Sequence, residues 1–404
     1  MKIQSIEVFA FKYNHHYRVG GHTDAPNRLH GTDYYFEPQW KHAYSCLTES
    51  CLVKITTDTG LTGWGEAQAP LVPEVPAMLI AKLFGPAIIG LNPEDPELIY
   101  DRLYHLSHVR GHTASYTIDA ITGIDIALWD IKAQAAGKPL NQLLGEVALP
   151  RLPLYVSGLR RPTLSERQQL AKEKIAEGFK GVKIFIGNTA EKTIDECTAI
   201  RSAIGTDARF ALDTICRHDY QTAYRIGRGL DDLHAAWFES PMDPEDVVGH
   251  AALAKFIQTP LAIGESLRTV REFEPWVARK AMQIAQPDIA RCGITGGQRI
   301  IQLLQEKNMQ IAPHIGVCTA LGIAATWHVA SVLVHPVMQE HQLDMFEVGN
   351  SVLHKPLQVE SGQAIVPRGA GLGIAVNEDF VRKNSPEKWQ ISIQGVRYGH
   401  RDNK

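Results

Sequence analysis

The sequence predicts an α/β barrel flanked by an α+β domain, and two observations support this prediction. Short apolar runs alternate with helical patterns over roughly 190 residues, as in eight-stranded barrels. Three of these runs also end in carboxylates, Asp213, Glu239 and Glu265, which follow one another at intervals of 26 residues. Such a spacing suits one strand, one helix and their loops. The candidate strands are 152–157, 181–186, 208–213, 235–239, 260–265, 282–288, 309–314 and 336–340.

An open, doubly wound sheet is the alternative arrangement of the same elements. That fold usually carries a glycine-rich phosphate-binding turn after one of its strands. The sequence has neither a GxGxxG motif nor a P-loop after any candidate strand, which favours the barrel.

The segments on either side of the barrel predict a second domain. Residues 1–11 alternate like a half-buried strand, and 49–67 fit a hairpin that turns at Asp58–Gly60. The apolar spacing of 115–136 predicts a long helix. We therefore expect an α+β capping domain with a lid loop over 1–145 and the barrel over 146–345. The pattern after 345 is irregular and β-like, so residues 346–404 are expected to return to the capping domain.

Composition excludes several classes of protein. The 404 residues are 44% hydrophobic and carry a net charge of −3, which indicates neither a nucleic-acid partner nor an anionic membrane. The longest uncharged apolar run, Ala320–Val334, has 15 residues and contains His328, which is short for a membrane span. The N-terminus lacks a signal-like apolar core. Six cysteines without a CxxC pair predict free thiols rather than disulfides or zinc. A soluble, cytoplasmic protein is expected.

The three equally spaced acids predict a metal site. The carboxyl ends of barrel strands meet at one rim, where barrel enzymes place their chemistry. Three oxygen ligands would leave about three positions of an octahedral Mg²⁺ for water and substrate oxygens. One such acid alone would as readily cap a helix or pair with a surface cation, but three at equal spacing favour the metal.

Further polar residues end the other candidate strands: Lys183, Asp288, His314 and Glu340. A lysine and a metal could neutralise an enediolate formed when a carbon acid loses its α-proton. His314 could take that proton, oriented by Asp288. Each has a structural alternative: Asp288 could cap a helix, His314 could be a satisfied core residue, and Lys183 could lie at the surface. Glu340 could bind the substrate carboxylate or neutralise Lys183, with Glu347 as its rival.

The segment 12–44 predicts a lid. It is long and irregular and holds five histidines, as well as arginines and tyrosines. Its character would suit an acidic, hydroxylated ligand, and an oligomer contact is the alternative. The candidate substrate-binding residues are His15, Arg18, His22 and Tyr34.

Taken together, these motifs resemble the enolase superfamily, specifically its mandelate racemase subgroup. The resemblance covers nearly the whole chain: GWGE, GIDIALWDIKAQAAGKPLNQLLG, LD, FESP, GES, QPDIARCGITG and APH occur in family order. It implies a modified (β/α)7β barrel with an α+β cap. It also implies that Asp213, Glu239 and Glu265 bind Mg²⁺ and that Asp288 and His314 form a general-base dyad. Glu340 matches the glutamate that binds the substrate carboxylate, and Lys183 matches the first lysine of a KxK motif.

Two positions depart from the family pattern. Phe185 replaces the second lysine of the KxK motif, and Ile215 occupies a position at which the subgroup often has asparagine. A racemase needs a proton donor on each face of the enediolate, and phenylalanine cannot be one. A dehydratase can use His314 alone, with a lid tyrosine as the other candidate acid for the leaving hydroxyl.

The resemblance therefore implies Mg²⁺-dependent dehydration of an acid sugar, an aldonate or aldarate, to a 2-keto-3-deoxy acid. The alternatives are a cycloisomerase or epimerase that uses the same half-reaction, and a non-catalytic, metal-binding regulatory protein. The only partners expected are the small-molecule substrate and further copies of the chain, in a dimer to an octamer.

Overall fold

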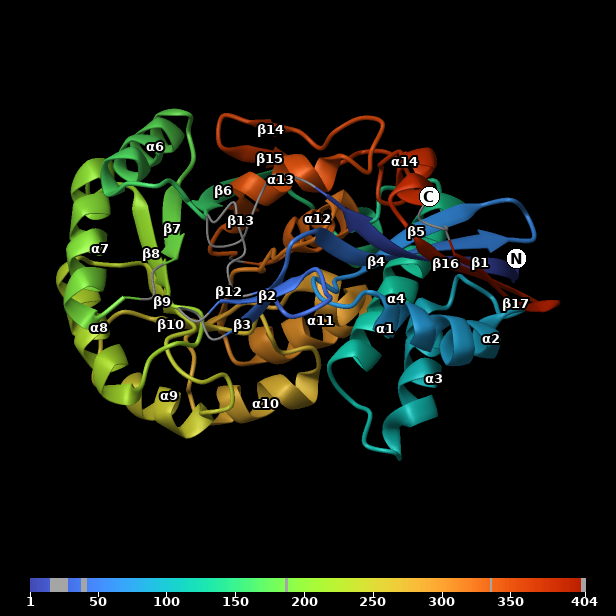
Figure 1. Cartoon of the computed structure of the whole chain (residues 1–404), viewed down its shortest axis with the longest axis horizontal. Helices are drawn as coiled ribbons and strands as arrows, with labels where there is room; N and C mark the ends of the chain where they lie inside the picture. The colour runs from blue at the N-terminus through green and yellow to red at the C-terminus, as the bar shows by residue number, and fades with distance from the viewer. Residues whose placement is uncertain (15–27, 38–41, 186–187, 335, 401–404) are drawn as a thin grey trace.

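The computed structural model describes residues 1–14, 28–37, 42–185, 188–334 and 336–400. A barrel occupies one end of the molecule and a smaller α+β domain the other (Figure 1). The two are joined by the long helix α4 (Tyr116–Ala135), which packs on β5 (Thr62–Ala67) and on the barrel helix α11 (Ile289–Glu306).

The barrel is built from parallel strands that pair in chain order. Pairing runs without interruption from β6 to β12, and β13 pairs in parallel with β6, for example Gln339 with Leu154. A single bridge between Ile311 and Pro336 joins the remaining gap. The strands are β6 (Arg151–Ser157), β7 (Gly181–Phe185), β8 (Arg209–Asp213), β9 (Trp237–Glu239), β10 (Leu261–Ile263), β11 (Ile284–Ala285), β12 (Gln310–Ile311) and β13 (Gln339–Gln342). Each lies in or overlaps a predicted strand, although several are shorter than predicted.

Helices connect these strands and cover the outside of the barrel, and α6 to α10 form an arc in Figure 1. A capping box opens α6 at Thr163, because the Thr163 hydroxyl accepts a hydrogen bond from the Glu166 backbone N–H and the Glu166 side chain accepts one from the Thr163 backbone N–H. The remaining helices are α6 (Leu164–Ala176), α7 (Ala190–Ile204), α8 (Tyr220–Asp232), α9 (Val247–Leu253), α10 (Val270–Ala278) and α12 (Ala320–Ala330). Helix α12 is apolar and buried because it lies between the barrel and β5.

The second domain is an antiparallel sheet with helices, and its strand order is β17-β16-β1-β4-β5. Strands β4 (Thr48–Thr57) and β5 form the hairpin predicted from the sequence. Strand β16 (Glu387–Ser392) pairs with β1 (Ile3–Tyr13), so both ends of the chain share this sheet, and β17 (Gly395–His400) forms its edge. The other helices are α1 (Glu74–Leu79), the π-helix η1 (Ile80–Phe84), α2 (Gly85–Ile88), α3 (Pro96–His108) and α5 (Asn141–Leu144).

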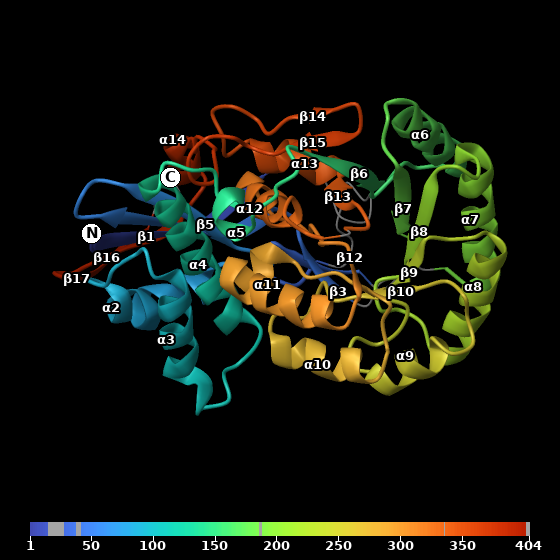
Figure 2. The same ribbon diagram turned by 180° about the vertical axis from the view of Figure 1, so that it is seen from behind.

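The segment after 345 differs from the irregular, β-like pattern that the sequence predicts. It contains helices α13 (Leu343–Asn350) and α14 (Glu378–Lys383) beside the short strands β14 (Val359–Glu360) and β15 (Gln363–Ile365). Helix α13 escapes prediction because β13 runs directly into it and its N-cap residue, Gln342, provides no side-chain cap. In the view from behind, α13 and β15 lie beside β6 and β13 (Figure 2).

Within the described part of the chain, none of the helices combines the length and the apolar character needed to cross a bilayer.

Candidate active site

Glu239 is the most firmly held of the predicted metal ligands. It is the last residue of β9 and is fully buried. Its Oε1 lies 2.5 Å from Lys183 Nζ, and its Oε2 accepts hydrogen bonds from Trp237 Nε1 (2.9 Å) and Gln286 Nε2 (2.6 Å). These donors fix the carboxylate in one orientation before any ligand arrives.

Asp213 ends the neighbouring strand β8, in register with Glu239. Its Oδ1 accepts from the backbone N–H of Ile215 (2.8 Å) and its Oδ2 lies 3.9 Å from Lys183 Nζ. The chain after each of these two acids is strained: φ is +50° at Ile215, +54° at Cys216 and +42° at Ser240. A β-branched residue rarely adopts such a φ, and strain of this kind concentrates at functional sites.

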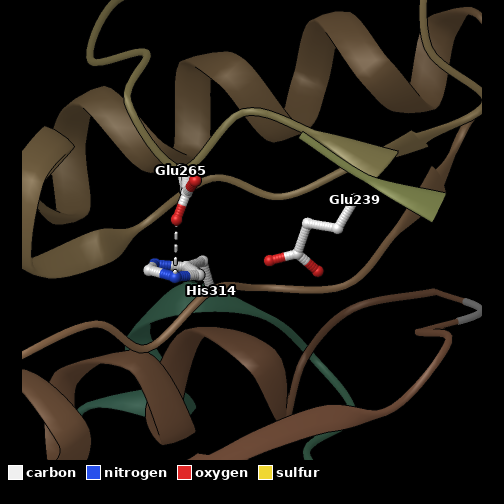
Figure 3. Close-up of side chains that lie close together, drawn as sticks. All are labelled: Glu239, Glu265 and His314. Carbon is white, nitrogen blue, oxygen red and sulfur yellow. Dashed lines mark ion pairs between the residues drawn. The ribbon is translucent and has the colours of Figure 1, made fainter. Parts of the chain in front are cut away.

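Glu265 and His314 face each other across the rim (Figure 3). His314 Nε2 lies 3.1 Å from Glu265 Oε2, and its Nδ1 lies 2.8 Å from Asp288 Oδ2. Asp288 is the N-cap of α11, since its side chain also accepts from the Ala290 backbone. Asp288 therefore caps the helix, as the structural alternative predicts, and contacts His314 as well. The parallel bridge between Asp288 and His314 sets the two side chains next to each other.

Glu340 lies on β13, opposite these acids. Its Oε1 is 3.0 Å from Lys183 Nζ, and its Oε2 accepts from the Ile315 backbone (3.2 Å) and lies 3.8 Å from His314 Nε2. Its rival, Glu347, is exposed on α13. The geometry therefore brings Glu340, and not Glu347, to the predicted dyad.

The charges of the site perturb one another strongly. Burial and the carboxylate of Glu239 raise the pKa of Asp213 well above its ordinary value. Burial opposes the charge of His314, but Glu340, Asp288 and Glu265 outweigh it and raise the imidazole pKa well above its usual range. Burial also opposes ionisation of Glu265, yet the hydrogen bond from His314 lowers its pKa to about 2. Lys183, fully buried between Glu239 and Glu340, likewise has a raised pKa despite its burial.

This donor set fits a hard divalent cation. One atom from each of Glu239, Glu265 and His314 lies within 4.8 Å of the other two. On the neighbouring strand, Asp213 adds a third carboxylate, whose pKa is raised first by burial and then by the charge of Glu239, against the opposing effect of Lys183. Carboxylate oxygens are the ligands that Mg²⁺ prefers. Of the predicted ligands, Glu239 and Glu265 are thus near enough to each other for a shared ion, together with His314.

The predicted substrate-binding residues of the lid do not join the acids among the described residues. His15, Arg18 and His22 lie outside the described residues. Tyr34 begins the hairpin of β2 (Tyr34–Glu37) and β3 (His42–Ser45), but its hydroxyl donates to Glu49 (3.0 Å) and accepts from the Val72 backbone (3.0 Å). Among the described residues, the structure thus ties Tyr34 to the capping sheet and does not bring it to the acids.

The sequence reasoning missed two residues near the site, Tyr44 and Arg160. Tyr44 lies on β3, and burial raises its pKa; Arg160 then lowers that pKa, while Asp213 and Glu265 add to the rise. Its hydroxyl therefore lies within electrostatic reach of the acids. The guanidinium of Arg160 lies 5.2 Å from the ring centroid of Phe185, the residue at the altered KxK position. Tyr44 belonged to the predicted lid, but nothing in its local sequence distinguishes it from Tyr34.

Two family models match the chain. The mandelate racemase / muconate lactonizing enzyme N-terminal domain matches residues 38–145, and the enolase C-terminal domain-like family matches residues 166–380. Together they span most of the capping domain and of the barrel.

Among curated proteins, the chain is 30% identical over 340 residues to D-galactarolactone cycloisomerase of Agrobacterium fabrum, covering 81% of this chain and 89% of that protein. It is 32% identical over 310 residues to L-talarate/galactarate dehydratase of Salmonella typhimurium, covering 75% of this chain and 74% of that protein. Among solved structures, a member of the enolase superfamily from Agrobacterium tumefaciens superposes with a TM-score of 0.89 at 28% identity, covering 99% of this chain and 100% of that one. The 3,6-anhydro-D-galactonate cycloisomerase of Zobellia galactanivorans superposes with a TM-score of 0.82 at 27% identity, covering 95% of this chain and 99% of that one.

Proposed function

We propose that this chain, which belongs to the mandelate racemase subgroup of the enolase superfamily, is a Mg²⁺-dependent acid sugar dehydratase. Its substrate would be an aldonate or aldarate, and its product the 2-keto-3-deoxy acid. Its barrel would be of the modified (β/α)7β type. One observation carries the proposal: His314 is paired with Asp288, while phenylalanine occupies position 185, where a second base would be expected.

Asp213, Glu239 and Glu265 would hold the metal ion. When bound, Mg²⁺ supplies Lewis-acid stabilisation of negative charge on the substrate carboxylate, worth several kcal/mol in such sites. Lys183 adds a second positive charge, which its contacts with Glu239 and Glu340 hold in a fixed position. The site thereby stabilises the charge that develops when the α-proton leaves.

His314 is the base in this proposal. In the present arrangement its Nε2 faces Glu265, and that carboxylate favours the imidazolium. Glu265 would hold the cation together with the other acids, and its carboxylate would then favour the imidazolium less, so that Nε2 could accept a proton. Asp288 keeps the ring in place through Nδ1.

The reaction then balances as the loss of one water. The α C–H bond breaks and its proton passes to His314 Nε2, leaving its electron pair in the enediolate. The β C–O bond breaks next, and the hydroxyl leaves as water with a proton from His314 or from a lid tyrosine. The resulting enol takes up its keto form. Phe185 cannot deliver a proton to the opposite face, so a product with an inverted α-carbon is not expected.

A cycloisomerase or epimerase of a related sugar acid or lactone is the second candidate. It is favoured by two similar proteins whose names describe cycloisomerases. It would use the same base and differ in the fate of the proton. A binding-only regulatory protein is less well supported, because it would have no use for a histidine held by an aspartate beside the acids.

The test is a screen of aldonates and aldarates with Mg²⁺, in which semicarbazide traps a 2-keto product that is followed by absorbance. A dehydratase yields the semicarbazone, and α-proton exchange in D₂O accompanies it. We expect His314→Asn to reduce both turnover and exchange by about 10²- to 10⁴-fold, the usual contribution of a general base.

The matched control is His341→Asn, because this buried histidine lies on the same strand as Glu340 but packs between Phe179 and Phe346. Exchange without a 2-keto product would replace the dehydratase by the isomerising alternative. Exchange that survives in His314→Asn would move the base elsewhere, with Lys183 as the first candidate.

A further inference from the structure

The loop after β6 places an arginine at the barrel rim. The strand ends at Ser157, and Gly158 turns the chain with φ at +106°, a conformation that favours glycine. Arg160 follows in this loop, half-buried, with its guanidinium carbon 5.2 Å from the ring centroid of Phe185. An aromatic face within about 6 Å attracts a guanidinium and limits where it can lie. Phe185 thus helps to position the arginine.

Phe185 separates two cations that have different surroundings. Lys183 Nζ lies 5.4 Å from the same ring centroid, but it is fully buried and is committed to Glu239 and Glu340. Arg160 is at the rim and is only half-buried. The residue next to it, Arg161, lies 3.9 Å from Asp344 on α13. Of the two neighbouring arginines, it is Arg160 that lies against the altered KxK position.

The hairpin of β2 and β3 connects Arg160 with the acids. His42 Nε2 lies 3.4 Å from the carbonyl of Ile215, whose own N–H donates to Asp213. On the same strand, Tyr44 experiences the charges of Arg160 and of Asp213 together. The hairpin thus lies within electrostatic reach of both Arg160 and the acids, and the contact with Phe185 sets Arg160 beside Lys183.

The chemistry of arginine limits what this residue can do. A guanidinium does not lose its proton in proteins, so Arg160 cannot replace the acid that Phe185 removes. Its planar fork of N–H donors instead suits a carboxylate, which it can bind through two hydrogen bonds. A cation fixed at the rim, apart from the buried Lys183, is suited to a second anionic group on the same ligand.

We infer that Arg160, positioned by Phe185, binds a second carboxylate of the substrate, so that the chain acts on sugar diacids in preference to monoacids. This inference rests on the proposed function, because it assigns the first carboxylate to the metal ligands and Lys183. It selects the aldarates from the two substrate classes. Arg160 is a binding residue in this scheme and takes no part in proton transfer.

The experiment compares ligands that differ only at the terminal carbon. Binding of galactarate and galactonate, and of glucarate and gluconate, is measured by calorimetry with the Mg²⁺-loaded protein. We expect the diacid of the accepted configuration to bind about 10- to 100-fold more tightly than its monoacid, the range for a hydrogen-bonded charged partner. Arg160→Met should abolish this preference, and Arg160→Lys should retain part of it. The control Arg161→Met should leave it unchanged.

Several outcomes would overturn the inference: equal binding of diacid and monoacid, binding of neither, or a preference that survives in Arg160→Met. Circular dichroism establishes that each variant is folded, and Arg160→Lys replaces Arg160→Met if the latter does not fold. The α-proton exchange of the bound diacid in D₂O is followed in the same samples. A diacid preference that depends on Arg160 without any exchange would refute the proposed dehydratase and leave the binding role intact.

Discussion

The molecule buries carboxylates in two regions whose surroundings differ in how they stabilise the charge. The first region is the barrel rim. The second is the seam between the capping domain and the barrel, which we define by Glu66, Asp125 and Asp130. In the seam each acid accepts several hydrogen bonds: Glu66 accepts from Ser50, Thr319 and Gly322, and Asp125 accepts from the backbone and hydroxyl of Thr295. Asp130 accepts hydrogen bonds from the backbone N–H groups of Trp64 and Leu372.

At the rim, by contrast, carboxylates lie close to other carboxylates. Burial is the largest cause of the raised pKa of Asp213, as it is for Asp125 and Asp130, whose pKa values rise to about 7 and about 6. At Asp213, however, the carboxylates of Glu239 and Glu265 add to the rise. Hydrogen-bond donors offset the cost of burying the seam acids. The rim acids have Lys183 and His314 between them but still repel one another. Burial of acids is therefore common to both regions, and the crowding of like charges is what distinguishes the rim.

The strongest test of this contrast is the same substitution in both regions. We expect Asp213→Asn to weaken Mg²⁺ binding by at least about 10- to 100-fold. The metal-free variant should also be more stable than the metal-free wild type, because one of three crowded charges is gone. Calorimetric titration with Mg²⁺ and denaturant unfolding in EDTA measure the two effects.

Asp130→Asn is the matched control for that experiment. Both oxygens of Asp130 accept from backbone N–H groups, at 3.0 Å and 2.8 Å, so an amide leaves one N–H facing another donor. We expect a loss of about 1–3 kcal/mol of unfolding free energy and unchanged Mg²⁺ affinity. Unchanged metal binding in Asp213→Asn would remove this acid from the proposed ligand set.

The pH dependence of stability sharpens the comparison within the seam. Burial raises the pKa of Asp125 from 3.8 to about 7, so the folded state holds a proton that the unfolded state has already released. This contribution to stability is complete below pH 4 and is lost as the pH rises through 7. It amounts to about 2–4 kcal/mol. Asp125→Asn should remove it.

The difference between the wild-type and Asp125→Asn unfolding curves isolates this group. Asp130, with its pKa near 6, contributes in the same direction, while burial lowers the pKa values of His328 and His341 to about 4 and makes stability fall toward acid pH. These contributions cancel in the difference. A difference that does not change between pH 4 and 8 would mean that Asp125 stays ionised through its bonds to Thr295.

The sequence was enough to predict the barrel, its strands and the residues that meet at the rim, because strand ends converge by geometry. The charge contrast was not predictable in the same way. Glu66 is visible in the sequence as part of the GWGE motif, but the main donors to it lie about 250 residues further along the chain, at Thr319 and Gly322. Arg160 and Tyr44 were missed because their positions depend on how a loop and a hairpin pack against Phe185 and the rim. The domain boundaries, the homo-oligomer and the roles of His15, Arg18 and His22 stay predictions.

The smallest expected effect is that of Glu66→Gln. Glu66 Oε2 accepts from Gly322 N–H (2.9 Å) and from the backbone and hydroxyl of Thr319 (3.0 and 2.7 Å). Oε1 accepts from Ser50 (2.6 Å) and, at 2.8 Å, from the same Thr319 N–H. A glutamine can keep its oxygen toward Gly322 and turn its amide toward Ser50, whose hydroxyl can accept as well as donate. We therefore expect a loss of only about 1 kcal/mol of unfolding free energy, measured by denaturant titration.

Removing the hydroxyl tests this explanation. In a Ser50→Ala background the amide introduced by Glu66→Gln would face no acceptor, so the substitution should then cost about 2–3 kcal/mol, as expected for a buried unpaired donor. Ser50→Ala alone serves as the reference for the cycle. Additive effects of the two substitutions would show that Ser50 does not rescue the amide. The small cost of Glu66→Gln would then need another explanation. A strong coupling between the two substitutions would instead confirm that hydrogen-bond donors, and not opposing charges, stabilise the seam acids.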